Sequence, residues 1–136
     1  MAQLKLFCDR ISHASRAPLL LLHCAKVPHE EISLKLFRGE HMKRPELPFK
    51  KLPVLIDGDL TLAESTSILR YIGQQPGAGQ WYGDRSVREK VKIDEYLDFW
   101  QSSLHPTAVR LLQNKLMYKV CPVPDRLTIY LQLTFC

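Results

Sequence analysis

The sequence contains few cysteines, and they form no recognisable pattern. Cys8, Cys24, Cys121 and Cys136 make no CxxC pair and have no zinc-ligand spacing. We therefore expect reduced thiols, with neither a disulfide framework nor a metal site. Cys8 and Cys24 are each predicted to be buried and unreactive, because each shares a face with apolar residues.

Long apolar runs and blocks of like charge are also missing. No stretch approaches the roughly 20 apolar residues of a membrane-spanning helix, and the N-terminus MAQLKLFCDR lacks the apolar block of a signal peptide. The 19 Lys and Arg exceed the 14 Asp and Glu by five, but basic and acidic residues are interleaved. We expect a cytoplasmic protein that binds neither membranes nor nucleic acid.

The composition is that of an ordinary globular protein. Of the 136 residues, 46% are hydrophobic and 24% are charged. A chain of this length can bury a core without metal or disulfide support, but it has no room for a second complete domain.

The first third of the chain predicts a strand, a helix and a second strand. Residues 4–8 alternate between apolar and other side chains, as in a strand. A helix that ends at Pro28 follows, and its predicted buried face contains Ala17, Leu20, Leu21, Cys24 and Val27. The second strand is expected to place on one face Ile32, Leu34 and Leu36.

The middle of the chain predicts a long connection, a hairpin and a helix. Residues 37–51 show no clean period and contain Gly39, Pro45 and Pro48. The hairpin comprises strands over 53–56 and 60–63, joined by the sequence DGD. A helix is expected from Glu64-Ser65 to Gly73.

The pattern changes after this α/β arrangement. We predict a domain over 1–76, a linker over 77–84, a helical segment over 85–119 and a divergent tail over 120–136. Pro106 should kink or break the helix. The last ten residues, LTIYLQLTFC, alternate as a strand would and carry no charge.

Three segments together resemble the theta class of cytosolic glutathione transferases. They are LKLFCDRISHASRA, FKKLPVLIDGDLTLAESTSILRYI and DRSVREKVKIDEYLDFWQ, within about residues 3–119. The resemblance implies a thioredoxin-like α/β domain, followed by the first helix or helices of an incomplete all-α domain. The chain departs from the family at His13-Ala14, where Gln-Pro is usual.

The resemblance implies a catalytic role for Ser12, which follows the first strand. Its hydroxyl would donate a hydrogen bond to the sulfur of glutathione and favour the thiolate, since a free thiol ionises only near pH 8.5. The alternative interpretation is a loop or helix-cap serine.

The same resemblance implies that glutathione binds the residues before and after the hairpin. Pro53 would be a cis-proline that exposes the backbone of Leu52 to pair with the ligand, or else an ordinary proline at the start of a strand. Glu64 and Ser65 would hold the γ-glutamyl end, or else serve as a helix cap and a first-turn acid.

Two cations complete the implied site. His41 and Lys51 match positions that face the glycyl carboxylate of glutathione. Each residue, taken alone, is also typical of a solvated surface.

The predicted function is a theta-like transferase that conjugates glutathione to small electrophiles, acts on peroxides and forms homodimers as its family does. It requires no cofactor, since glutathione is a co-substrate. We expect weak conjugation, because the family's second domain is incomplete here and should leave part of an apolar helix face uncovered. This face contains Val91, Leu97, Trp100, Leu104 and Leu111.

Two other classes of function are alternatives to this prediction. A noncatalytic thioredoxin-like module, or an inactive variant that pairs with full-length subunits, stays open. A thiol–disulfide oxidoreductase is disfavoured, because residues 12–15 contain no cysteine.

Overall fold

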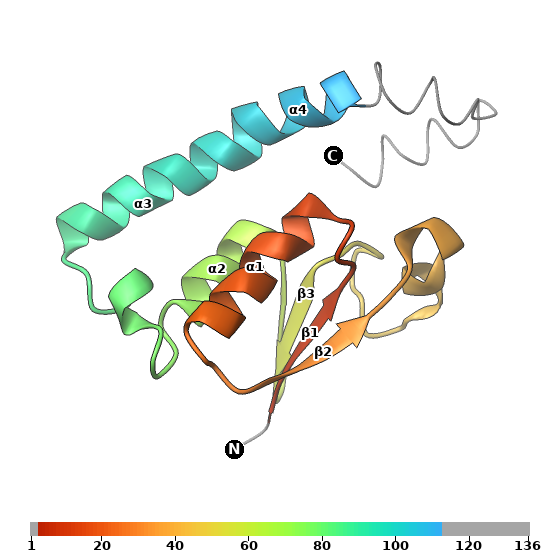
Figure 1. Cartoon of the computed structure of the whole chain (residues 1–136), viewed down its shortest axis with the longest axis horizontal. Coiled ribbons are helices and arrows are strands. Elements are labelled where there is room, and N and C mark those ends of the chain that lie inside the picture. Colours follow the sequence, from red (N-terminus) through yellow and green to blue (C-terminus); the bar gives the residue numbers. More distant parts are fainter. Residues whose placement is uncertain (1–2, 113–136) are drawn as a thin grey trace. The chain divides into compact units, whose positions relative to one another are not determined.

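The computed structural model describes residues 3–112, which contain a four-stranded mixed sheet (Figure 1). The strands are β1 (Leu4–Cys8), β2 (His29–Ser33), β3 (Val54–Asp57) and β4 (Leu60–Ala63), in the order β2-β1-β3-β4. β1 is parallel to β2 and antiparallel to β3, and β4 is antiparallel to β3.

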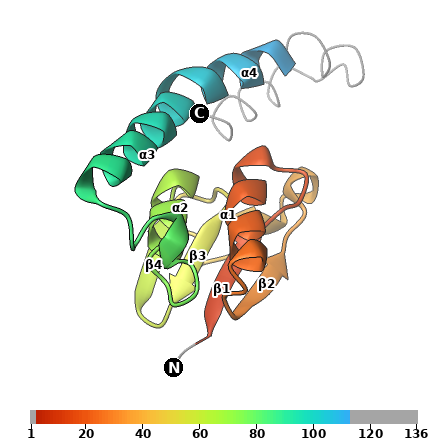
Figure 2. The same ribbon diagram turned by 60° about the vertical axis from the view of Figure 1, so that its left-hand side comes forward.

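Two helices cover one face of this sheet. They are α1 (His13–Cys24) and α2 (Ser65–Ile72), which lie side by side in Figure 2. Because side chains alternate along a strand, every second residue of β1 faces the helices. The resulting core cluster includes Leu4, Leu6, Cys8, Leu19, Leu22, Leu55, Ile68 and Ile72.

The opposite face of the sheet packs against the long connection between β2 and β3. Phe7 and Val54 form a second cluster there with Leu34 and Leu47. The connection itself contains two short 3-10 turns, Leu36–Arg38 and Glu40–Lys43. This arrangement confirms the predicted thioredoxin-like fold.

The helical period of α1 was predicted correctly, but the buried face was predicted only in part. Val27 is buried and Leu21 packs against the core, whereas Ala17 is exposed. The buried residues are Ser15, Pro18, Leu19 and Leu22, whereas Leu20 is 64% exposed. Four consecutive leucines at 19–22 leave the phase of the helix undetermined by hydrophobicity alone. The helix also ends at Cys24, well before Pro28, and the thiol of Cys24 is exposed rather than buried.

The second strand is shorter than predicted. The amide of Leu34 donates to the carbonyl of Cys8 (2.8 Å), where β1 ends. Beyond this bond β2 has no neighbouring backbone on β1 to pair with, so Leu36 begins a 3-10 turn instead. Gly39, with φ of 66°, ends that turn in the left-handed region.

The predicted hairpin and the helix after it are confirmed. Val54 pairs with Ala63 and Asp57 with Leu60, around a turn that contains Gly58 at φ of 59°. α2 buries Ile68 and Ile72 on its inner face.

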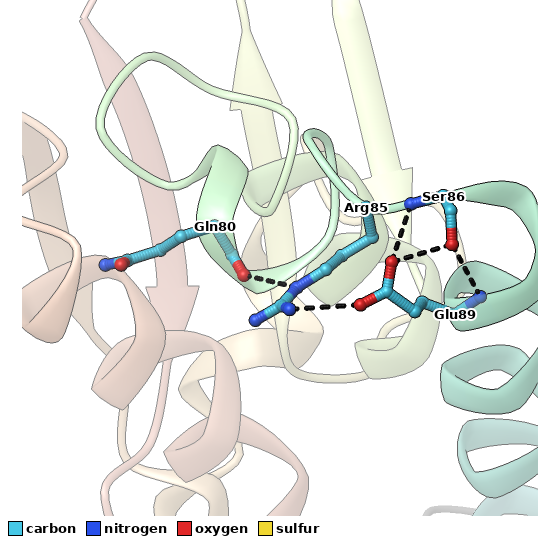
Figure 3. Close-up of polar contacts among 4 residues, drawn as sticks. All are labelled: Gln80, Arg85, Ser86 and Glu89. Atoms are coloured by element: carbon cyan, nitrogen blue, oxygen red, sulfur yellow. Dashed lines mark hydrogen bonds and ion pairs between the residues drawn. The ribbon is translucent and has the colours of Figure 1, made fainter.

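Helix α3 (Val87–Phe99) begins with a capping box (Figure 3). The amide of Ser86 donates to Glu89 Oε2 (2.9 Å), and the amide of Glu89 donates to Ser86 Oγ (3.4 Å). Arg85 donates from Nη1 to Glu89 Oε1 (3.2 Å) and from Nε to the carbonyl of Gln80 (2.8 Å). These bonds fix the chain direction at the start of the helix.

The break predicted near Pro106 is confirmed. A π-helical turn, Trp100–Leu104, separates α3 from α4 (His105–Leu112). Proline removes a backbone donor, so the regular i to i+4 pattern cannot pass through it unchanged.

The chain divides into two compact units, the first from Met1 to Lys90 and the second from Val91 onward. The predicted domain limits stay a prediction, and the predicted tail over 120–136 lies outside the described residues. No helix within residues 3–112 is both long and apolar enough to cross a membrane.

Candidate functional site

The strand register brings the predicted site segments to one edge of the sheet. Phe7 of β1 lies opposite Val54 of β3, which in turn lies opposite Ala63 of β4. Cys8 lies beside Ser33 of β2. The ends of β1, β2 and β4 and the start of β3 therefore lie at the same edge of the sheet. We call this edge the site edge.

Ser12 is the N-cap residue of α1 and is only 5% exposed. Its amide donates to the carbonyl of Asp9 (2.9 Å), and its own carbonyl accepts from Ser15 N (3.1 Å) and Arg16 N (3.2 Å). The hydroxyl makes no capping hydrogen bond. The side chain is thus held by its backbone while its hydroxyl stays available to a ligand.

The segment that enters β3 has the backbone geometry implied by the resemblance. The peptide bond between Leu52 and Pro53 is cis. Pro53 is buried, whereas Leu52 and Lys51 are half-buried.

Glu64 and Ser65 begin α2 at the site edge. Glu64 adopts φ of 71° and ψ of 115°, and its side chain makes no capping hydrogen bond. A positive φ is rare for a residue other than glycine and is concentrated at functional sites. Ser65, directly after it, is buried.

His41 lies in the second 3-10 turn and is 2% exposed. Neither Nδ1 nor Nε2 has a hydrogen-bond partner within residues 3–112. Burial lowers the pKa of the imidazole, and the charge of Asp9 acts in the opposite direction. A buried imidazole with unsatisfied nitrogens is suited to receive a polar ligand group.

The N-termini of two helices lie at the site edge, together with the carboxylates of Asp9 and Glu64. α1 and α2 both begin there, and neither has an acidic residue in its first turn. The partial positive charge of a helix N-terminus favours anions and thiolates.

Asp9 is a residue of this edge that sequence reasoning missed. It was assigned to a polar connection, but it is 2% exposed. An aspartate directly after a strand often accepts a hydrogen bond from the amide two residues later, in what is called an Asx turn. This local pattern could have identified Asp9. The neighbouring Cys8 is inert, since burial and then Glu31 raise the pKa of its thiol to about 12.

A cleft of about 570 Å³ lies elsewhere, and its lining includes Lys5, Phe7, Glu30, Ile32 and Ile56. None of the predicted site residues lines it. Within residues 3–112, no group of three or more His, Cys, Asp or Glu side chains could hold a metal ion.

Comparison with known proteins identifies a family of similar proteins. Residues 2–74 match the family model described as the glutathione S-transferase N-terminal domain. The human and rat proteins named glutathione S-transferase theta-1 are 30% and 28% identical over 120 residues, which are 86% of this chain and 50% of each relative. The solved human glutathione S-transferase T1-1 in its apo form is 27% identical with a TM-score of 0.79, covering 95% of this chain and 56% of that one.

The chain spans about half the length of the curated relatives it matches. Its family-model match covers more than half of its own 136 residues. The chain therefore belongs to the glutathione S-transferase family through its N-terminal domain, and its similarity is to the theta class.

Proposed function

We propose that the site edge binds glutathione and that Ser12 activates its thiol for transfer to small electrophiles. The observation that carries this proposal is the state of Ser12. It occupies a helix N-cap position, is nearly buried, and yet does not use its hydroxyl to cap the helix. A hydroxyl that is ordered and not engaged with the helix suits hydrogen bonding to a thiolate.

The remaining residues would hold the tripeptide at its ends. Glu64 suits the ammonium of the γ-glutamyl group, and Ser65 suits its carboxylate at the start of α2. Lys51 suits the glycyl carboxylate by its charge, and His41 can donate a ring N–H to it. The backbone of Leu52, beside Pro53, would pair with the middle of the ligand as an added strand.

The chemistry follows from the thiolate. Ser12 and the positive end of α1 favour loss of the thiol proton to solvent. The sulfur then attacks an electrophilic carbon, a carbon–sulfur bond forms, and the leaving group departs with its bonding electrons. Peroxide reduction, homodimer formation and weak conjugation stay predictions.

The test compares Ser12→Ala with Ser67→Ala, which alters an exposed serine of α2. Because the Ser12 hydroxyl makes no cap bond, the usual stability loss of a cap substitution should be absent. We expect Ser12→Ala to fold normally, raise the pKa of bound glutathione and lower turnover of an aryl halide roughly a hundredfold.

Three results would count against the proposal in different ways. Equal thiol pKa values and equal turnover in both variants would remove Ser12 from the mechanism. Binding without turnover in the unsubstituted chain would leave a binding site without catalysis. Failure of the folded chain to bind glutathione would favour the noncatalytic interaction module.

A further inference from the structure

The Asp9 side chain joins two segments that are distant in sequence. Its Oδ1 accepts a hydrogen bond from the amide of Ile11 (3.0 Å), and its Oδ2 accepts one from the amide of Leu36 (2.9 Å). The first bond closes the turn after β1, and the second reaches the chain that follows β2. One buried carboxylate therefore connects two of the segments that meet at the site edge.

The backbone of Asp9 fixes the turn that carries Ser12. Its carbonyl accepts from Ser12 N (2.9 Å), and its amide donates to Ser15 Oγ (3.4 Å). Ser15 is fully buried in α1. Displacement of Asp9 would therefore move Ser12 relative to the strand and the helix together.

The second oxygen of Asp9 fixes the segment that carries His41. Leu36 opens the first 3-10 turn, and its carbonyl accepts from Gly39 N (2.9 Å). Glu40 Oε2 accepts from Lys35 N (2.8 Å), which closes the same loop on itself. His41 follows directly in the second 3-10 turn. The loop is hydrogen-bonded within itself, and the Leu36–Asp9 bond joins it to the end of β1.

Only a carboxylate can satisfy both amides at once. Each of its oxygens accepts, whereas asparagine would offer one oxygen and place a donor against a donor. The neighbouring Arg10 is engaged elsewhere, with Nη2 2.8 Å from Glu31 Oε2. No Lys or Arg within residues 3–112 forms an ion pair with Asp9. Its negative charge therefore interacts with the two amides, and it also acts on the imidazole of His41.

We propose that Asp9 is the positioning residue of the glutathione site, which holds the Ser12 turn and the His41 loop in fixed positions relative to each other. This inference rests on the proposed function. Asp9 acts through Ser12 and His41 and does not itself touch the ligand. Each of its oxygens therefore governs a separate property of the site: thiol ionisation through Ser12, and carboxylate affinity through His41.

Two substitutions test the roles of the two carboxylate oxygens of Asp9 separately. Asp9→Asn keeps the shape of the side chain but cannot accept a hydrogen bond from each of the two amides on a separate oxygen. Asp9→Ser can keep the short-range bond to Ile11, as serine turns do, but cannot also reach Leu36. The control is Asp57→Asn, which removes a carboxylate that accepts from Tyr71 Oη (2.6 Å) at the hairpin turn, outside the site edge.

The readouts are amide hydrogen exchange at Ile11 and Leu36, glutathione affinity, and the pKa of the bound thiol. Asp9→Asn should speed exchange at one or both amides, weaken glutathione binding about tenfold and raise the thiol pKa. Asp9→Ser should speed exchange at Leu36 alone and weaken binding without changing the thiol pKa. Asp57→Asn should lower the melting temperature and leave the affinity and thiol pKa unchanged.

The outcomes separate this inference from the function on which it rests. If the unsubstituted chain binds glutathione and Asp9→Asn binds it with the same affinity and thiol pKa, the positioning role is overturned and the function stands. If the folded, unsubstituted chain does not bind, the proposed function fails. Should both Asp9 variants fail to fold, the unsubstituted chain decides: exchange at Ile11 and Leu36 as fast as in an open loop overturns the inference.

Discussion

The sheet unit, residues 3–86 with the four strands, α1 and α2, differs from the α3–α4 segment, residues 87–112, in how it buries apolar residues. In the sheet unit, α1, α2 and all four strands contribute to two clusters on the two faces of the sheet. In the α3–α4 segment Val109 of α4 is buried, but no residue of α3 is. The exposed apolar side chains of α3 include Val87, Val91, Tyr96 and Phe99. A sheet with covered faces completes its own core, whereas a lone amphipathic helix cannot.

The apolar helix face that the sequence predicted to be partly uncovered shows the same difference. Val91, Leu104 and Leu111 are exposed, and Leu97 and Trp100 are half-buried, as predicted. Every predicted site residue instead lies in the sheet unit. The geometry of the site therefore depends on the part of the chain with a closed core.

The largest effect should come from core truncation in the sheet unit. Leu22→Ala, at a position with 0% exposure, should lower the free energy of unfolding by about 2–5 kcal/mol, because it removes buried methyl groups and leaves a cavity. The same change at the exposed Leu20 of the same helix and at Leu111 of α4 should cost about 0.5 kcal/mol or less.

Chemical denaturation of the three variants measures this difference. A cost for Leu111→Ala as large as that for Leu22→Ala would show that α4 belongs to a closed core and would remove the contrast between the two regions.

A smaller effect should come from the helix start that joins the two regions. Ser86→Ala removes the hydroxyl bonds of the α3 capping box and should lower stability by about 1 kcal/mol, with loss of helix signal in circular dichroism. Ser67→Ala, at an exposed position of α2 without a capping role, is the control. Identical melting curves for the two variants would mean that the box does not stabilise α3.

The smallest effect concerns His41 and pH. Burial holds the pKa of folded His41 below its unfolded value of about 6.5, so unfolding takes up a proton in mildly acidic solution. The stability contributed by neutral His41 is complete above pH of about 6.5 and falls as pH drops toward the folded pKa.

A series of denaturation curves from pH 8 to pH 5 tests this dependence, with pH values of roughly one-unit spacing around the histidine range. His41→Gln should show a shallower decline than the unsubstituted chain. A parallel decline in both proteins would assign the pH dependence to other groups.

Local patterns in the sequence predicted the strands best. The alternation over residues 4–8 and the DGD turn identify β1 and the β3–β4 hairpin. The phase of α1 was not predictable, because Leu19, Leu20, Leu21 and Leu22 are equally apolar and only the sheet decides which of them is buried. The end of β2 depends on where β1 ends, which is a long-range property.

The site was predictable only in part. The positions of Ser12, Pro53 and Ser65 came from the resemblance to a family, and their roles stay predictions. The cis bond before Pro53 is a backbone property that composition cannot reveal. The Asx turn from Asp9 to Ile11 is local and was overlooked, whereas the bond from Leu36 to Asp9 joins segments that come together only in the folded chain.

The central claim is that the sheet unit carries a glutathione site, and calorimetric titration of glutathione into the folded chain tests it most directly. Ser65→Ala, at the buried start of α2, is compared with Ser67→Ala, two residues later and exposed. The account predicts saturable binding by the unsubstituted chain and Ser67→Ala, and about tenfold weaker binding by Ser65→Ala. Equal affinities in all three proteins, or no binding by the folded chain, would contradict it.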